Sequence, residues 1–75
     1  MKILFFGMLT EDIGNDEVEI EFSEDTESLK EILLNRYPAL KNRQFMIAVN
    51  KQKVNSNIAL NINDEIALIP PFAGG

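Results

Sequence analysis

The group in this sequence best suited to chemistry is the carboxyl of the last residue. The chain ends in Gly74-Gly75, and a glycine pair has no Cβ, so it can enter a slot too narrow for other residues. Side-chain chemistry is limited, because the sequence has no cysteine and no histidine. This composition excludes disulfides, thiolate metal sites, a cysteine nucleophile, a persulfide carrier and a histidine base. We expect Gly75, with Gly74 beside it, to be the reacting end of the protein.

Pro70 and Pro71 separate this end from the apolar run Ile66–Ile69. Proline lacks a backbone N–H and fixes φ, so the strand must end there and the chain leaves in an extended, stiff form. Fully extended, residues 70–75 reach roughly 20 Å at about 3.3–3.6 Å each. The sequence therefore predicts one domain, residues 1–75, with residues 70–75 as a protruding tail.

Length and composition limit the class of protein. The 75 residues allow one domain, and 45% hydrophobic with 25% charged residues is typical of a globular chain. The apolar start, residues 3–6, is too short for a signal peptide or a membrane span. A net charge of −5 without interleaved basic and aromatic residues argues against nucleic acid as a partner. We expect a cytoplasmic protein that binds neither membrane nor nucleic acid.

Acidic and basic residues occupy different parts of the chain. Ten of the twelve carboxylates lie between Glu11 and Glu31, whereas residues 38–63 have none and carry several cations, among them Lys53. A solvated surface explains most such blocks. The functional alternative is an acidic and a basic side that orient the protein on its partners. On that basis Lys53 is included among the predicted partner contacts.

Hydrophobic patterning predicts five strands. Two of them are almost wholly apolar, which is typical of central strands with both faces covered. The second strand alternates, so Val18, Ile20 and Phe22 are expected on a buried face and the glutamates between them in solvent. Residues 7–16, which contain turn-forming glycines, are expected to be a connection. The predicted strands are residues 3–6, 17–22, 45–49, a short return strand at Val54, and residues 65–69.

One amphipathic helix is predicted between the second and third strands. Leu29 and Leu33 recur at helical spacing, and residues 23–26 supply several N-cap side chains. The residue before a proline avoids the helical region, so Tyr37-Pro38 ends the helix. We therefore expect a helix from about Thr26 to Arg36.

A single helix covers only one face of a small sheet, so alternate strand residues are expected to form an exposed apolar patch on the other face. The alternative is that the patch is covered by residues 8–13 or by residues 58–62, where Ile58, Leu60 and Ile62 are expected to anchor a long connection. An exposed patch would let a partner hold the body and receive the tail together. The predicted partner contacts are Leu4, Phe6, Met46, Ala48, Lys53, Ala67, Ile69, Pro70, Pro71, Phe72 and Ala73.

The order strand, strand, helix, strand, short strand, strand is that of the α+β ubiquitin-like β-grasp fold, a mixed sheet of four to five strands on one main helix. The chain also resembles the MoaD family, the small subunits of molybdopterin synthase. Asn63 stands where the family usually has glycine, and Thr10 where it commonly has arginine. The resemblance is carried by residues 2–6 with Gly14, by Ala48-Val49-Asn50, and above all by residues 63–75, which end in Pro-Pro-x-x-Gly-Gly.

The resemblance implies a sulfur carrier rather than an enzyme that acts alone. In such carriers an E1-like enzyme adenylates the terminal carboxyl with ATP, and a sulfur donor converts it to a thiocarboxylate. The tail then enters the active site of the large synthase subunit and gives its sulfur to precursor Z, forming the dithiolene of molybdopterin. For this chain the resemblance implies Gly75 as the reacting residue, no bound metal or cofactor, and a heterotetramer of two small and two large subunits.

Two other functions stay open at this point. The same chemistry could serve thiamine or cysteine synthesis or tRNA thiolation, although thiamine carriers generally lack Pro-Pro before the tail. The chain could also be a ubiquitin-like modifier joined to lysines, or a β-grasp adaptor. An autonomous enzyme is disfavoured, because the sequence has no nucleophile–base pair, metal cluster or phosphate loop.

Overall fold

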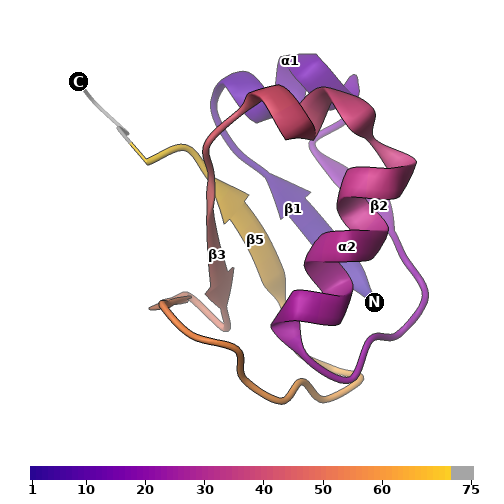
Figure 1. The fold of residues 1–75 in the computed structure, drawn as a ribbon, viewed down its shortest axis with the longest axis vertical. Coiled ribbons are helices and arrows are strands. Elements are labelled where there is room, and N and C mark those ends of the chain that lie inside the picture. The colour runs from indigo at the N-terminus through magenta and orange to yellow at the C-terminus, as the bar shows by residue number, and fades with distance from the viewer. Residues whose placement is uncertain (72–75) are drawn as a thin grey trace.

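A mixed sheet of five strands packs against one long helix in the computed structural model, which describes residues 1–71 (Figure 1). The sheet order is β2-β1-β5-β3-β4; β1 and β5 are parallel, and the other neighbouring pairs are antiparallel. The expected α+β class and β-grasp arrangement are confirmed. In chain order the elements are β1 (Lys2–Phe5), α1 (Met8–Ile13), β2 (Glu17–Glu19), α2 (Thr26–Arg36), the 3-10 helix η1 (Pro38–Asn42), β3 (Met46–Val49), β4 (Gln52–Val54) and β5 (Ile66–Ile69).

Helix α2 has the predicted bounds, and its ends follow from local chemistry. Asp25 is the N-cap, and its carboxylate accepts a hydrogen bond from the Ser28 backbone N–H at 2.9 Å. At the other end the Tyr37 N–H donates to the Leu33 carbonyl at 2.8 Å, and Pro38 follows. Leu29 and Leu33 are fully buried. Burial of such a leucine contributes about 1.5–3 kcal/mol, so the apolar stripe fixes α2 on the sheet.

The core lies between α2 and the inner face of the sheet. Ile3 and Phe5 of β1 and Ile66 and Leu68 of β5 are buried, as the alternation predicts. The Phe5 ring meets Tyr37 edge to face, with 6.1 Å between ring centroids. The strands therefore present one set of alternate residues to the helix and the other set to the opposite face.

Residues 8–13 form helix α1, not the irregular connection that the sequence predicts. Gly14 ends the helix with φ 85°, and its N–H donates to the Thr10 carbonyl at 2.9 Å. Leu9 is buried in the core. A helix of six residues has too few apolar positions to give a periodic signal, so tertiary burial of Leu9 decided this element.

Strand β2 is shorter than predicted, and Phe22 is 43% exposed rather than buried. The β1–β2 ladder ends at Met1 and Ile20: the Ile20 N–H donates to the Met1 carbonyl at 2.9 Å, and the N-terminal ammonium donates to the Ile20 carbonyl at 2.7 Å. Ile20 is still buried, but residues 21–24 form no strand, and the next pairing is the isolated bridge between Asp25 and Ala59. The alternating apolar and acidic pattern of residues 17–22 therefore extends past the last residue of β2.

The long connection between β4 and β5 is anchored by two of its three predicted residues. Leu60 is buried and Ile58 is partly buried, whereas Ile62 is 67% exposed, so its predicted role is wrong. A tight turn puts Ile62 at its tip: the Asp64 N–H donates to the Asn61 carbonyl, and the Asn61 N–H donates back to Asp64 Oδ2. Within residues 1–71 no helix is long and apolar enough to cross a membrane.

Candidate functional site

The tail root, Pro70-Pro71, leaves the body from the centre of the sheet. Strand β5 lies between β1 and β3, so it is hydrogen-bonded on both sides up to the point where the prolines begin. Both prolines are partly buried. In Figure 1, β1 and β5 point toward the same end of the molecule, where α1 lies. The direction of the tail root is therefore set by the middle strand of the sheet, which is paired on both sides.

Pro70 packs against the backbone of Gly7, which the sequence did not single out. Gly7 has φ 59°, and a Cβ placed on it would lie 2.8 Å from Pro70 Cγ. Real Cβ atoms do not approach this closely, so only glycine allows the contact. The available signal was a glycine directly after an apolar strand, which marks either a turn or a close approach of two backbones.

A groove of about 230 Å³ lies beside the tail root. Met8, 54% exposed, is on one wall, and the segment after η1 forms another. Arg43 Nε lies 2.6 Å from Asp12 Oδ2, and this hydrogen bond raises the pKa of Arg43. The sequence pointed to neither Met8 nor Arg43 as part of this region. The groove is lined by Met8, Leu9, Arg43, Gln44, Pro70 and Pro71.

The outer face of the sheet, opposite α2, carries most of the predicted body contacts. The pairing places Leu4 beside Ala67, Ala67 beside Ala48, and Ala48 beside Lys53, and cross-strand partners share a face. In the next row toward the tail root, Met46 pairs with Ile69. The apolar residues of these pairs and Phe6 form a surface that we call the outer apolar face: Leu4, Phe6, Met46, Ala48, Ala67 and Ile69.

Exposure on this face varies with position. Phe6 is 48% exposed, and Leu4, Met46, Ala67 and Ile69 are partly exposed. Ala48 is only 2% exposed, so the expectation of an accessible side chain there is wrong. Its side chain is a single methyl group, and its strand lies between β4 and β5 in the sheet. The structure thus gathers the predicted body contacts on one face.

The two segments expected as alternative cover belong to the core instead. Leu9 from residues 8–13 and Leu60 from residues 58–62 are buried in the core cluster that includes Leu29 and Leu33 of α2. They pack with the inner face of the sheet rather than over Leu4 and Phe6. The outer apolar face therefore keeps the exposure described above.

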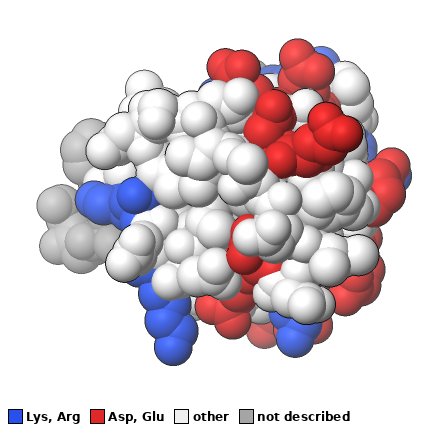
Figure 2. Space-filling model, turned by 90° about the horizontal axis from the view of Figure 1, so that it is seen from below, with Lys and Arg blue, Asp and Glu red and all other residues white. Residues whose placement is uncertain are grey.

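The β2 edge of the outer face carries ion pairs: Glu17 Oε2 lies 3.8 Å from Lys2 Nζ, and Glu19 Oε2 lies 3.1 Å from the N-terminal ammonium. On β2, Glu17 pairs with Leu4 and Glu19 pairs with Lys2, so both glutamates point to this face. Lys53 is exposed on β4, at the other edge. Figure 2, which views the molecule from below, shows most of the carboxylates on the right, with Lys and Arg on the left and also among the carboxylates. The two edges therefore differ, with paired charges on β2 and an exposed cation on β4.

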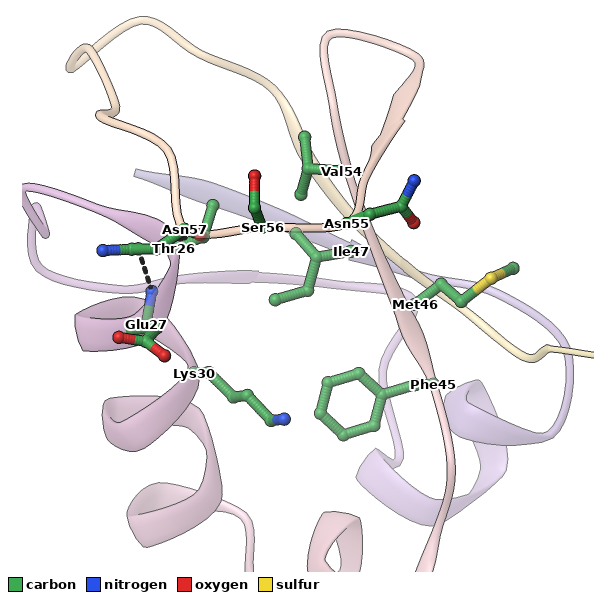
Figure 3. A pocket seen from close by; sticks show the side chains of 10 residues that line it. All are labelled: Thr26, Glu27, Lys30, Phe45, Met46, Ile47, Val54, Asn55, Ser56 and Asn57. Carbon is green, nitrogen blue, oxygen red and sulfur yellow. Dashed lines mark hydrogen bonds between the residues drawn. The ribbon is translucent and has the colours of Figure 1, made fainter.

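A second hollow, about 280 Å³, lies between the start of α2 and strands β3 and β4 (Figure 3). On one side of it, Asn57 Oδ1 accepts hydrogen bonds from the Glu27 N–H at 2.9 Å and from Thr26 Oγ1 at 3.1 Å. Lys30 points toward the Phe45 ring, with Nζ 5.8 Å from the ring centroid. These contacts hold the connection between β4 and β5 to the start of α2, so we interpret this hollow as structural.

Chemistry within the described part of the chain is sparse. Residues 1–71 contain no cluster of three or more His, Cys, Asp or Glu residues that could hold a metal ion. The predicted reacting residues Gly74 and Gly75, and the predicted contacts Phe72 and Ala73, lie outside the described residues. Their roles stay predictions. What the structure provides is a firmly held tail root beside a partly exposed apolar face.

Comparison with known proteins gives the family. The model of the ThiS family matches residues 3–75. A molybdopterin synthase sulfur carrier subunit from Caenorhabditis briggsae is 37% identical over 81 residues, which cover 100% of this chain and 96% of that protein.

Solved structures agree. A Helicobacter pylori protein, solved as a complex of subunits 1 and 2 of molybdopterin-converting factor, is 30% identical with a TM-score of 0.74, covering 99% of this chain and 96% of that one. A Pyrococcus furiosus protein assigned as molybdopterin converting factor subunit 1 is 26% identical with a TM-score of 0.85, covering 95% of each chain. The H. volcanii small archaeal modifier protein 1, at 22% identity and a TM-score of 0.81 over 95% of each chain, shares the fold.

The sequence match extends through the Gly-Gly end, and the fold match covers nearly all of the chain. The resemblance that the sequence indicated is thereby confirmed. This chain belongs to the ThiS family, and its relatives include the sulfur carrier subunits of molybdopterin synthase.

Proposed function

We propose that this protein is the sulfur carrier of molybdopterin synthase, its small subunit. The observation that carries the proposal is the full-length match to sulfur carrier subunits, which extends over the strand that leads from the centre of the sheet into Pro70-Pro71 and the Gly-Gly end. A tail anchored in the central strand can be presented to another protein while the body stays folded. The reaction would take place in the cytoplasm.

The proposed reaction begins at the Gly75 carboxyl. A carboxylate is a poor acceptor, so an E1-like enzyme first joins it to AMP from ATP, releasing pyrophosphate. A sulfur donor then displaces AMP, and the carboxylate becomes a thiocarboxylate. The thiocarboxylate sulfur is ionised and nucleophilic without a neighbouring base, which suits a chain without histidine. In the last step the sulfur passes to precursor Z.

In this proposal the catalytic side chains belong to the large subunit. The Helicobacter pylori relative was solved as a complex of subunits 1 and 2, which supports a large-subunit partner for this chain. The outer apolar face, with glutamates at the β2 edge and Lys53 at the β4 edge, is the surface we assign to that partner. Two small and two large subunits would form the assembly, which sedimentation of the purified complex would test.

The experiment that tests the proposal is intact mass spectrometry of the protein after incubation with ATP, an E1-like activating enzyme from the same cell and a sulfur donor. We expect a mass gain of one sulfur-for-oxygen exchange, mapped to Gly75. The chain without Gly75 is the control and should gain nothing. Added to the large subunit and precursor Z, the thiocarboxylated protein should yield molybdopterin.

The same experiment distinguishes the other functions. Thiocarboxylation without molybdopterin formation would point to a carrier for thiamine, cysteine or tRNA thiolation. No thiocarboxylation, with the activating enzyme active on another carrier, would contradict the proposal. High-mass conjugates through lysine would then indicate a modifier, and full function of the chain without Gly75 would indicate an adaptor.

A further inference from the structure

We propose that Gly7 is a positioning residue that fixes the direction in which the tail leaves the body. The inference deepens the proposed function and rests on it, because the direction of the tail matters only if its end must reach an active site. Gly7 lies in the turn between β1 and α1, and Pro70 is the first residue of the tail root.

The contact between the two residues has no room for a side chain. A Cβ on Gly7 would lie 2.8 Å from Pro70 Cγ, 3.5 Å from its Cδ and 4.0 Å from its Cβ. Gly7 also has φ 59° with ψ −137°, a conformation that side chains with L configuration disfavour. The Pro70 ring therefore rests directly on the Gly7 backbone, and any larger residue at position 7 must push the ring away.

Hydrogen bonds hold the turn on the Gly7 side of this contact. The Phe6 N–H donates to the Leu68 carbonyl at 3.2 Å, which extends the pairing of β1 with β5 to the residues next to the contact. The Thr10 N–H donates to the Gly7 carbonyl at 3.1 Å, and Thr10 Oγ1 donates to the Phe5 carbonyl at 3.1 Å. A side chain on residue 7 would thus move the Pro70 ring rather than the turn.

A small rotation of Pro70-Pro71 changes the direction in which the chain leaves the body. Consecutive prolines restrict φ at two positions, so the chain cannot bend back freely at the root. The four residues after Pro71 can reach at most about 14 Å beyond it, so the direction of Pro70-Pro71 limits where the end of the chain can lie. A misplacement of about 1 Å of a reacting group can cost roughly 100-fold in rate. We therefore expect a change at Gly7 to affect the rate of reaction at Gly75 more than the binding of the partner.

The test is a double-mutant cycle of Gly7→Ala and Pro70→Ala. Single-turnover rates of adenylation are measured at saturating activating enzyme, with KM for the carrier measured separately. We expect Gly7→Ala to lower the rate by about 10-fold or more, with KM changed much less. In the Pro70→Ala background the same change at Gly7 should have little further effect, because alanine lacks the Cγ and Cδ atoms that the new Cβ would meet. The cost of a positive φ for alanine at position 7 is the same in both Pro70 backgrounds, so it cancels when the effects of Gly7→Ala in the two backgrounds are compared.

Gly14→Ala is the matched control. Gly14 also has positive φ, 85°, but a Cβ there would meet nothing within 4 Å. We expect it to leave the adenylation rate within about twofold of wild type, although positive φ destabilises the fold. Rates are compared under conditions in which urea titration shows every variant folded. A rate for Gly7→Ala equal to wild type, or an equal loss in both Pro70 backgrounds, overturns the inference.

A measurement on the free protein separates this inference from the proposed function. Nuclear Overhauser contacts between the Gly7 α protons and the Pro70 ring protons are expected in wild type. Residual dipolar couplings of residues 70 and beyond are expected to change in Gly7→Ala and to stay unchanged in Gly14→Ala. Absence of these contacts, or unchanged couplings in Gly7→Ala, overturns the positioning role. A wild-type chain that shows them but is never adenylated overturns the proposed function instead.

Discussion

Arg43 and Asp12 form a two-point ion pair that joins the segment after η1 to α1, the two elements whose residues line the groove at the tail root. Arg43 Nε lies 2.6 Å from Asp12 Oδ2, and Arg43 Nη2 lies 3.1 Å from Asp12 Oδ1. Asp12 belongs to α1, and Arg43 directly follows η1. The planar guanidinium matches both carboxylate oxygens at once, which a single ammonium group cannot do. The pair therefore braces two walls of the groove that holds Pro70 and Pro71.

Replacement of Arg43 by lysine should loosen α1 without unfolding the protein. The charge is kept and the two-point geometry is lost, and exposed ion pairs contribute little to global stability. We expect an almost unchanged urea midpoint and severalfold faster hydrogen exchange of the α1 amides. Arg36→Lys, which affects the exposed pair with Glu21, is the control. Equal acceleration in both variants would contradict a local brace.

Replacement of Phe6 by aspartate should weaken binding to the large subunit. Phe6 is 48% exposed at the tail-root end of the outer apolar face, and buried aromatic residues commonly dominate interfaces. We expect a loss of roughly 30-fold in affinity, equivalent to about 2 kcal/mol, with the fold retained. Titration calorimetry measures it.

Phe22→Asp is the matched control for that change. Phe22 is 43% exposed but lies between β2 and α2, outside the outer apolar face. It should bind the large subunit like wild type. Unfolding of Phe6→Asp would show instead that Phe6 is needed for the core, and equal losses in both variants would remove the outer face as the docking surface.

One residue added after Gly75 should abolish sulfur transfer and leave the free energy of unfolding unchanged. The added residue moves the carboxyl away from the glycine end and puts a side chain where none fits. Mass spectrometry after the activation reaction, together with a urea titration, checks both parts. An extended chain that is still thiocarboxylated and active would mean that the position of the carboxyl is not limiting.

Truncation of Leu33 to alanine should test whether α2 supplies the core. Leu33 is fully buried, so we expect a loss of about 2–5 kcal/mol in the free energy of unfolding. A domain this small has little stability to spare, so the variant should be largely unfolded near the upper value. Leu34→Ala, at a partly buried neighbour, should cost clearly less. Similar urea midpoints for the two variants would contradict the assigned helix face.

Stability should fall in acid partly through Asp25. The Ser28 backbone N–H holds the pKa of Asp25 below its ordinary value. Its contribution is therefore fully present above the unfolded-state pKa of about 3.9 and is lost as pH falls through the lower folded-state pKa.

Asp25→Ser keeps an N-cap oxygen but does not titrate. We expect urea midpoints close to wild type at neutral pH and a shallower decline below about pH 4. An unchanged decline would assign acid sensitivity to other carboxylates, such as Asp64, whose pKa is lowered by the Asn61 backbone N–H.

The elements predicted well are those with a strong local signal. Helix α2 has a cap, an apolar stripe and a terminating proline, and it has the predicted bounds. The sequence failed to predict α1, which is too short to show a helical period, and it wrongly predicted an accessible Ala48. It also wrongly predicted burial of Phe22 and an anchoring role for Ile62, because the apolar pattern extends past the point where a partner strand or a packed surface is available. Apolar side chains on a small protein are not always buried, and pattern alone cannot tell which remain outside.

The sequence by itself determined the chemistry that the chain can offer, because the absence of cysteine and histidine and the Pro-Pro and Gly-Gly of its end are facts of composition and order. It also determined the alternation that separates the two faces of the sheet. Only the tertiary structure decided that Pro70 rests on Gly7, that Arg43 pairs with Asp12, and that Ala48 is covered. These contacts join segments far apart in the chain, and their geometry depends on how strands and helices pack, which no local pattern encodes.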